Sequence, residues 1–282
     1  LQTRDFREGR TSLPYRETNV LVQPQGRNFR ESHNDTIRYG GGWLIFGVGL
    51  VLAAFLAARG RIPMGERPSG THVVRFNALE RTTHWMTATS FLAMALTGLA
   101  ILYGKPLLIP LIGERAFSSV AYASAWIHMA LAVPFVTGIT MMALMWMRAN
   151  IPSRVDWEWL KAGGGFLRDD GPHPPAPRFN AGQKGVFWGV VLGGFAMLAT
   201  GINLMFPFYW LSYDGMQWSQ LLHGGIGVAL VALIIGHIYI GTVGMVGAFQ
   251  AMWSGLVDRT WARQHHSLWY DRIVSETHDG TP

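Results

Sequence analysis

Four histidines lie inside apolar stretches of the sequence, where an ionisable side chain is unusual. They are His84, His128, His223 and His237. An ionisable side chain at membrane depth is costly and by default marks a functional site. The alternative for each histidine is a hydrogen bond between two packed helices, with no ligand involved. Their positions along the chain favour a shared function, because they fall at two matching depths.

The last two histidines share one helix face. His223 and His237 are 14 residues apart, which on an α-helix is a rise of about 21 Å and nearly four full turns. His84 follows Arg81 at the arginine-rich end of its stretch, and His128 lies toward the opposite end of the next stretch. Depth therefore pairs His84 with His237 near one membrane surface. By the same argument, His128 pairs with His223 near the other.

Imidazole pairs at two depths suit heme better than other metal cofactors. Heme iron with two protein nitrogens is saturated, so it exchanges electrons without binding a substrate. Zinc normally gathers three or four ligands at one point. The sequence has no cysteine, which excludes a cysteine-ligated iron–sulfur cluster and covalently attached heme. We therefore expect two b hemes. Gly98 follows His84 by 14 residues, so it points toward the site of His128 and His223. A glycine there would leave space for the heme ring.

The histidines need membrane-spanning helices to hold them. Only 14% of the residues are charged and 49% are hydrophobic, whereas about a quarter of the residues in a soluble domain are charged. The net charge of +6 comes from lysines and arginines in connections and tails, which indicates membrane topology rather than nucleic-acid binding. The apolar stretches, each long enough to cross a bilayer, are residues 39–58, 82–104, 117–147, 185–211 and 218–249.

Orientation follows from the lysines and arginines in the connections. Residues 59–81 hold five and residues 148–184 hold six, whereas the alternate connections hold two and none. The positive-inside rule places the richer connections and the C-terminal tail, 250–282, in the cytoplasm. Five spans then place the N-terminal tail, 1–38, in the periplasm of a bacterial inner membrane, although its seven arginines run against the rule. We expect this tail to be extended, because it is polar and lacks helical periodicity.

A polar segment precedes the fourth span on the side of His84 and His237. Asn180 and Gly182 offer an amide side chain and a backbone donor to a quinone carbonyl, which predicts a quinone pocket there. Alternatively, Asn180 caps the helix and Lys184 extends to the membrane surface. The aromatic stretch Trp261–Tyr270 in the C-terminal tail reads as an amphipathic surface segment.

The sequence resembles the cytochrome b subunit, gamma, of membrane-bound formate dehydrogenases over about residues 74–275. The resemblance implies a four-helix di-heme cytochrome b bundle with the four histidines as ligands, and a quinone pocket at Asn180, Gly182 and the neighbourhood of His237. It also implies an iron–sulfur subunit and a molybdenum or tungsten catalytic subunit outside the membrane. The N-terminal extension and the span 39–58 depart from the shortest members of the family. The resemblance rests on Arg81–Trp85, Phe179–Lys184, Leu222-His223, His237–Tyr239 and Trp261–Tyr270.

We therefore expect an all-α membrane protein in which residues 82–249 form the di-heme bundle and residues 39–58 add one N-terminal transmembrane helix. The expected function is that of a membrane cytochrome b subunit, which passes electrons from the iron–sulfur subunit through two b hemes to a quinone. Formate itself is oxidised on another subunit. The histidine pattern also occurs in cytochrome b subunits of nickel–iron hydrogenases, so a hydrogenase partner is the nearest alternative. A heme-free membrane anchor for a soluble enzyme is an alternative of another class.

Overall fold

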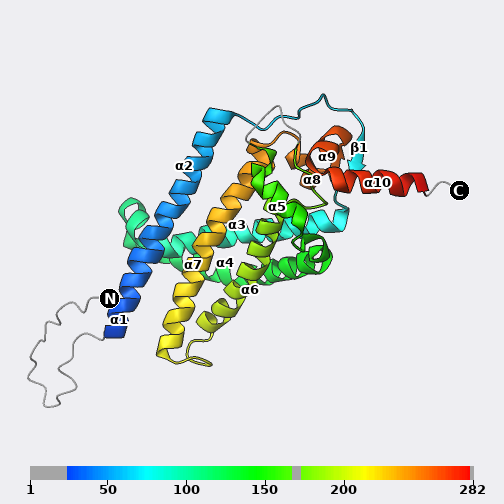
Figure 1. The fold of residues 1–282 in the computed structure, drawn as a ribbon. Coiled ribbons are helices and arrows are strands. Elements are labelled where there is room, and N and C mark those ends of the chain that lie inside the picture. Colours follow the sequence, from blue (N-terminus) through cyan, green and yellow to red (C-terminus); the bar gives the residue numbers. More distant parts are fainter. Residues whose placement is uncertain (1–23, 167–172, 280–282) are drawn as a thin grey trace, which may run out of the picture.

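The protein is mostly helical, as the sequence predicts. The computed structural model describes residues 24–166 and 173–279 (Figure 1). Five helical segments of the described chain are long and apolar enough to cross a membrane, so this is an all-α, multi-pass membrane protein with an extra N-terminal span. These segments are Gly26–Arg59, Ala78–Leu107, Ile109–Trp146, Ala181–Met205 and Tyr213–Gly244.

The spans are built from α-helices with π-helical turns in the first and last. The first contains α1 (Pro24–Glu31), the π-helix η2 (Ser32–Gly40) and α2 (Gly41–Arg59), and it is followed by α3 (Ala78–Leu107), α4 (Ile109–Trp146), α6 (Ala181–Met205), α7 (Tyr213–Tyr239) and the π-helix η5 (Ile240–Gly244). Outside the spans lie β1 (His72–Val74), α5 (Arg154–Lys161), α8 (Ala248–Trp253), β2 (Leu256–Asp258), α9 (Arg259–His265) and α10 (Ser267–Asp279).

The first helix begins earlier than the sequence predicts. The expectation of an extended tail over residues 1–38 is wrong from Pro24 onward, and residues 1–23 lie outside the described part of the chain. Ile37 is buried, and a Cβ placed on Gly224 of α7 would lie 3.1 Å from it. The hydroxyl of Tyr103 in α3 donates a hydrogen bond of 2.8 Å to the carbonyl of Arg38. These contacts with α7 and α3 stabilise a helix in this segment, although its polar composition does not favour one.

The α3 and α4 helices pack closely along each other as a hairpin. A Cβ on Gly138 of α4 would lie 2.0 Å from Thr87 Oγ1 of α3, so only glycine allows this approach. The sequence predicts a tilt or kink in this span because of Pro134. Inside α4, however, the backbone leaves helical angles at Gly113, where φ is 76°, so the change of direction precedes the apolar part of the helix.

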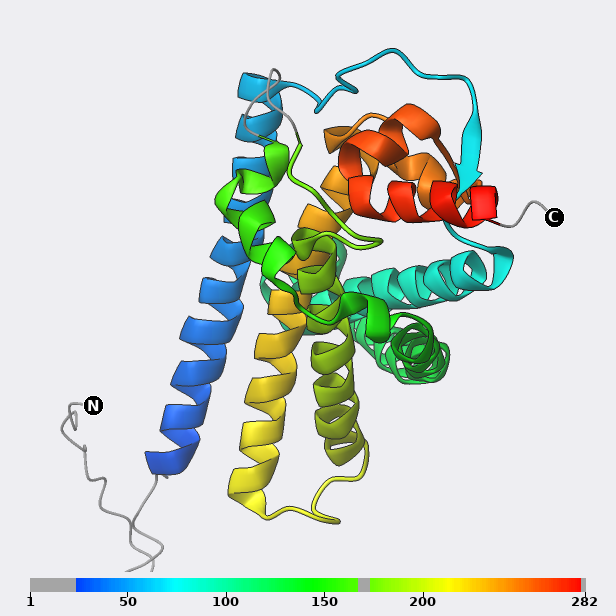
Figure 2. The same ribbon diagram turned by 45° about the vertical axis from the view of Figure 1, so that its right-hand side comes forward.

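A second hairpin consists of α6 and α7, and α2 lies along α7. Here too glycines allow close approach: a Cβ on Gly193 of α6 would lie 3.0 Å from Leu230, and one on Gly41 of α2 would lie 2.9 Å from Val228. Figure 1 and Figure 2 both show the α3–α4 hairpin crossing α2, α6 and α7 steeply. The two hairpins therefore meet over limited stretches of helix, and the histidines lie where they meet.

The C-terminal segment 248–279, here called the C-terminal cap, folds back over one end of the helices (Figure 2). Its strand β2 pairs antiparallel with β1, so the cap is joined to the connection that precedes α3. The expectation of a surface segment is wrong for Trp261 and Trp269, which are only 4% and 5% exposed. Burial of large aromatic rings favours a packed cap over a segment lying on the membrane surface.

Candidate functional site

The four membrane histidines form two facing pairs in the structure. The ring centres of His84 and His237 are 6.2 Å apart, and those of His128 and His223 are 6.1 Å apart. In both pairs the ring planes are inclined at 60°. The pairings predicted from depth are confirmed as contacts. We call His84 with His237 the inner pair and His128 with His223 the outer pair, after their predicted sides of the membrane.

The separation within each pair fits a single heme iron between two imidazoles. A metal–imidazole bond is about 2 Å long and the ring centre lies about 1 Å behind the bonding nitrogen, so two imidazoles on opposite sides of one iron have centres about 6 Å apart. In the described residues no group of three or more histidine, aspartate or glutamate side chains could hold a metal ion. The donor set is therefore two separate imidazole pairs, which suits heme b and does not suit zinc.

The outer pair is held by hydrogen bonds that the sequence reasoning missed. Nδ1 of His128 lies 2.9 Å from the backbone carbonyl of Met94 and 3.1 Å from the hydroxyl of Thr97, both in α3. Nδ1 of His223 lies 3.0 Å from the hydroxyl of Thr200 in α6. A repeated sequence could have indicated these hydrogen bonds: Met-Ala-Leu-Thr-Gly occurs at 94–98 and Met-Leu-Ala-Thr-Gly at 197–201.

Gly98 lies at the outer pair, as its spacing from His84 predicts. A Cβ on Gly98 would lie 3.2 Å from Cε1 of His128, and a Cβ on Gly201 would lie 3.3 Å from Cε1 of His223. Each contact would be tighter than most real Cβ contacts. Glycine at these two positions therefore lets the neighbouring helix reach the edge of each ring.

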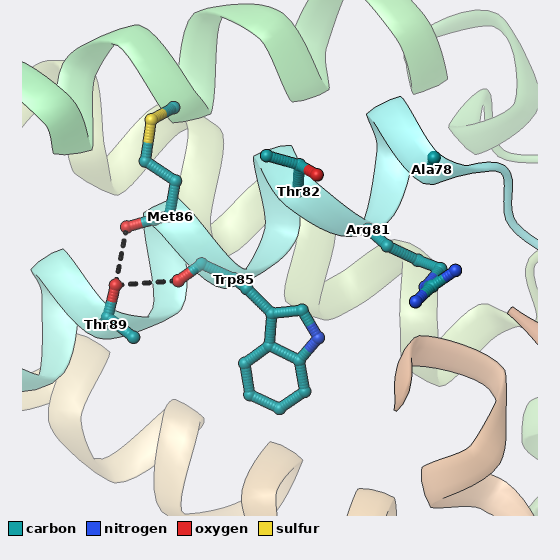
Figure 3. A pocket seen from close by; sticks show the side chains of 6 residues that line it. All are labelled: Ala78, Arg81, Thr82, Trp85, Met86 and Thr89. Atoms are coloured by element: carbon teal, nitrogen blue, oxygen red, sulfur yellow. Dashed lines mark hydrogen bonds between the residues drawn. The ribbon is translucent and has the colours of Figure 1, made fainter. Parts of the chain in front are cut away.

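The inner pair lies beside an aromatic side chain and a shallow pocket. The ring of His84 contacts Trp85 edge-on, with ring centres 5.3 Å apart, and the indole of Trp85 donates to the carbonyl of Met252 in α8 (3.0 Å). Figure 3 shows Trp85 at the wall of a pocket on one face of α3. The pocket has a volume of about 430 Å³ and is lined by Ala78, Arg81, Thr82, Trp85, Met86 and Thr89.

The proposed quinone residues have structural contacts of their own. Asn180 is the N-cap of α6: its side-chain oxygen accepts from the backbone N–H of Gln183, whose side chain accepts from the N–H of Asn180. Gly182 packs against the ring of Trp159 in α5. Neither Asn180 nor Gly182 lines the pocket in Figure 3, and their binding of a quinone stays a prediction.

The alternative reading is confirmed for Asn180, which caps α6, and is wrong for Lys184, which does not reach toward the membrane surface. Lys184 is 5% exposed, and its ammonium donates to Asp156 in α5 (2.8 Å) and to the carbonyl of Ile151 (3.0 Å). Burial by itself would raise the pKa of Asp156, but hydrogen bonds from Lys184 and Ser153 outweigh it and lower that pKa. The ion pair fixes α5 against the first turn of α6.

A buried arginine links the C-terminal cap to the segment before α3. The guanidinium of Arg75 lies 4.5 Å from the ring of Trp269 and 3.1 Å from Nε2 of His266. Burial and the charge of Arg178 lower the pKa of Arg75 to about 9. Burial and the charge of Arg75 hold the pKa of His266 well below its ordinary value. His266 is therefore neutral, donating from Nδ1 to the carbonyl of Pro177 (2.8 Å) and accepting from Arg75.

Comparison with known proteins covers the helix bundle. Residues 75–255 match the family model described as prokaryotic cytochrome b561. The cytochrome b556(Fdn) subunit of nitrate-inducible formate dehydrogenase from Escherichia coli (strain K12) is 29% identical over 206 residues, which cover 71% of this chain and 91% of that protein. The cytochrome b556(fdo) subunit of formate dehydrogenase from the same organism is 27% identical over 208 residues, 73% and 95% of the two chains. The cytochrome b556 subunit of formate dehydrogenase from Haemophilus influenzae is 27% identical over 214 residues, which cover 74% of this chain and 87% of that protein.

Proposed function

The chain belongs to the prokaryotic cytochrome b561 family, and from this premise we propose that it is the membrane cytochrome b subunit of a formate dehydrogenase complex, with two b hemes. The observation that carries the proposal is the two facing histidine pairs, with ring centres 6.2 and 6.1 Å apart. The names of the similar proteins, each a cytochrome b556 subunit of a formate dehydrogenase, support the choice of complex.

The residues of this chain would hold and separate the two cofactors. His128 and His223 would ligate one iron, and His84 and His237 the other; bound heme supplies reversible one-electron transfer at each pair. If each iron were held by two imidazoles, neither site would have room to bind formate, so formate oxidation would belong to another subunit. We propose a molybdenum or tungsten catalytic subunit for that reaction and an iron–sulfur subunit that delivers electrons to the outer pair.

We place the quinone at the inner face, between Asn180, Gly182 and the inner pair. The segment is polar, begins a helix, and lies on the side that the positive-inside rule assigns to the cytoplasm. The side-chain oxygen of Asn180 is engaged in capping, so the group left for a quinone carbonyl is its amide N–H. Protons for the reduced quinone would then come from the cytoplasm while electrons arrive from the periplasmic side.

The test is to purify the complex from membranes and measure its heme and its partners. We expect two hemes per chain that acid–acetone extracts completely, a low-spin absorption spectrum, and reduction of both hemes by formate. A heme content near one per chain, or heme that resists extraction, would contradict the two-heme proposal. Co-purification of a hydrogenase large subunit, with reduction by hydrogen and not by formate, would replace the proposed complex. Absence of heme would make the chain a membrane anchor.

A further inference from the structure

We propose that two matching Met-x-x-Thr-Gly segments position the outer pair and make it chemically different from the inner pair. One segment is Met94–Gly98 in α3 and the other is Met197–Gly201 in α6. The inference rests on the proposed function, since it concerns histidines that would ligate heme. It assigns a role to residues that contact the ligands rather than the metal.

The α3 segment fixes which nitrogen of His128 carries the hydrogen. The carbonyl of Met94, 2.9 Å from Nδ1, can only accept a hydrogen bond, so Nδ1 must donate. The hydroxyl of Thr97 donates its own hydrogen to the carbonyl of Ala93 (2.8 Å). Its oxygen, 3.1 Å from Nδ1, therefore accepts from the ring as well. This leaves Nε2 of His128 with the lone pair that a metal needs.

The α6 segment repeats this arrangement around His223. The hydroxyl of Thr200 donates to the carbonyl of Ala196 (2.9 Å) and lies 3.0 Å from Nδ1 of His223. The backbone carbonyl of Met197 is a second acceptor close to the same ring. Gly201, like Gly98 in α3, lies against Cε1 of the ring that its segment holds. Two separate helices thus present the same carbonyl, hydroxyl and glycine to the two histidines of one pair.

His84 of the inner pair is not held in this way. Nδ1 of His84 is buried and has no hydrogen-bond partner within the described residues. A hydrogen bond from Nδ1 fixes the orientation of a ligating histidine and raises its basicity. A more basic axial ligand stabilises oxidised iron and lowers the reduction potential of the heme. The segments therefore favour a lower potential at the outer pair than at the inner pair, the order in which electrons move inward.

The test replaces each threonine by valine, which keeps the shape and removes the hydroxyl, in the purified holo-complex. We expect Thr97→Val and Thr200→Val to retain two hemes per chain, because the carbonyls of Met94 and Met197 remain. In an optical redox titration, both variants should raise the midpoint potential of the same heme, the lower-potential one, and leave the other unchanged. Thr97→Ser and Thr200→Ser should restore the original potential.

Thr137→Val is the matched control, because its hydroxyl bonds the carbonyl of Val133 within α4 in the same manner but the side chain is exposed. It should change neither potential. The proposal would be overturned if neither valine variant changed a midpoint potential, or if Thr97→Val and Thr200→Val changed the potentials of two different hemes. An equal change of midpoint potential in Thr137→Val would overturn it as well. If a valine variant loses a heme, its serine counterpart decides: two hemes at the original potential support a role for the hydroxyl, and loss overturns it.

Failure of this inference can be told apart from failure of the proposed function. A wild-type complex with fewer than two hemes per chain contradicts the proposed function itself. If the wild-type complex has two hemes and neither Thr97→Val nor Thr200→Val changes a midpoint potential, only the positioning role is contradicted.

Discussion

Two asparagines cap transmembrane helices, and we propose that one of them also binds the quinone. Asn77 caps α3 and Asn180 caps α6, each in a reciprocal capping box with the residue three positions later. Capping uses the side-chain oxygen and leaves the amide N–H groups free for other partners. A substitution that removes the whole side chain would therefore mix loss of the cap with loss of a quinone contact.

Asn180→Asp separates the two roles. Aspartate caps as well as asparagine but, when ionised, has no N–H to donate. We expect both hemes to assemble and to be reduced by formate, while affinity for the quinone falls by about 1–3 kcal/mol because a carbonyl loses its donor. Steady-state kinetics with a soluble quinone analogue measure this.

Asn77→Asp is the matched control, since it changes the same kind of cap at α3 and should leave quinone kinetics unchanged. Unchanged kinetics in Asn180→Asp would place the quinone elsewhere, and the pocket lined by Arg81 and Trp85 (Figure 3) would be the next candidate.

At the scale of elements, α5 is attached to α6 by one buried ion pair. The side chains of Lys184 and Asp156 are 6% and 11% exposed. We expect Lys184→Ala to destabilise the protein by about 3–5 kcal/mol, because it leaves a buried carboxylate without its cation. Thermal unfolding of the purified complex measures the loss, and adding Asp156→Asn should recover part of it.

Arg272→Ala provides the comparison for this ion pair. Arg272 and Glu276 form a solvent-exposed pair one turn apart in α10, 62% and 69% exposed. Loss of this exposed ion pair in Arg272→Ala should change the free energy of unfolding by no more than about 0.5 kcal/mol. Equal effects of the two substitutions would show that the pair with Asp156 is not buried in the assembled protein.

The C-terminal cap should loosen in mild acid. Burial first, and then the charge of Arg75, lower the pKa of His266 below 6.5; burial and His173 lower that of His265 to about 3. The unfolded state therefore binds protons more readily below pH 6.5, so this contribution to stability is complete above that pH. It is lost as pH falls toward the lowered values, by up to about 1.4 kcal/mol per pH unit for each group.

Thermal unfolding midpoints measured between pH 7.5 and 5 test this contribution. His266→Gln, which keeps a donor and an acceptor but does not titrate, should flatten the pH dependence. His72→Gln is the control, because His72 is exposed on β1. An unchanged pH profile in His266→Gln would mean that the cap is not held by the neutral form of that histidine.

At the scale of the whole molecule, the two ends of the described chain lie at opposite ends of α2 and the bundle (Figure 1). With five spans, they should face opposite sides of the membrane. Because the sequence has no cysteine, one introduced thiol reports its own location. Ser32 in η2 and Ser275 in α10 are both exposed and suit this purpose.

In spheroplasts lacking the partner subunits, a membrane-impermeant maleimide should label Ser32→Cys and not Ser275→Cys. Inverted vesicles should give the opposite result. Labelling of Ser275→Cys in intact spheroplasts would reverse the proposed orientation, and with it the assignment of the inner and outer pairs.

The sequence by itself determined the spans and the pairing of the histidines. Both depend on the fixed rise and rotation of an α-helix, so the 14 residues between His223 and His237 already specify two depths on one face. The capping boxes at Asn77 and Asn180 are equally local, because donor and acceptor lie three residues apart.

Only the tertiary structure decided which groups surround those histidines. Thr97 is 31 residues from His128, and Lys184 is 28 residues from Asp156. Whether such side chains meet depends on which helix faces pack, and a periodic pattern cannot specify the rotation of one helix against another. For the same reason, the helix before Gly41 and the burial of Trp261 and Trp269 were missed. Contacts with distant segments stabilise them, and these contacts outweigh local composition.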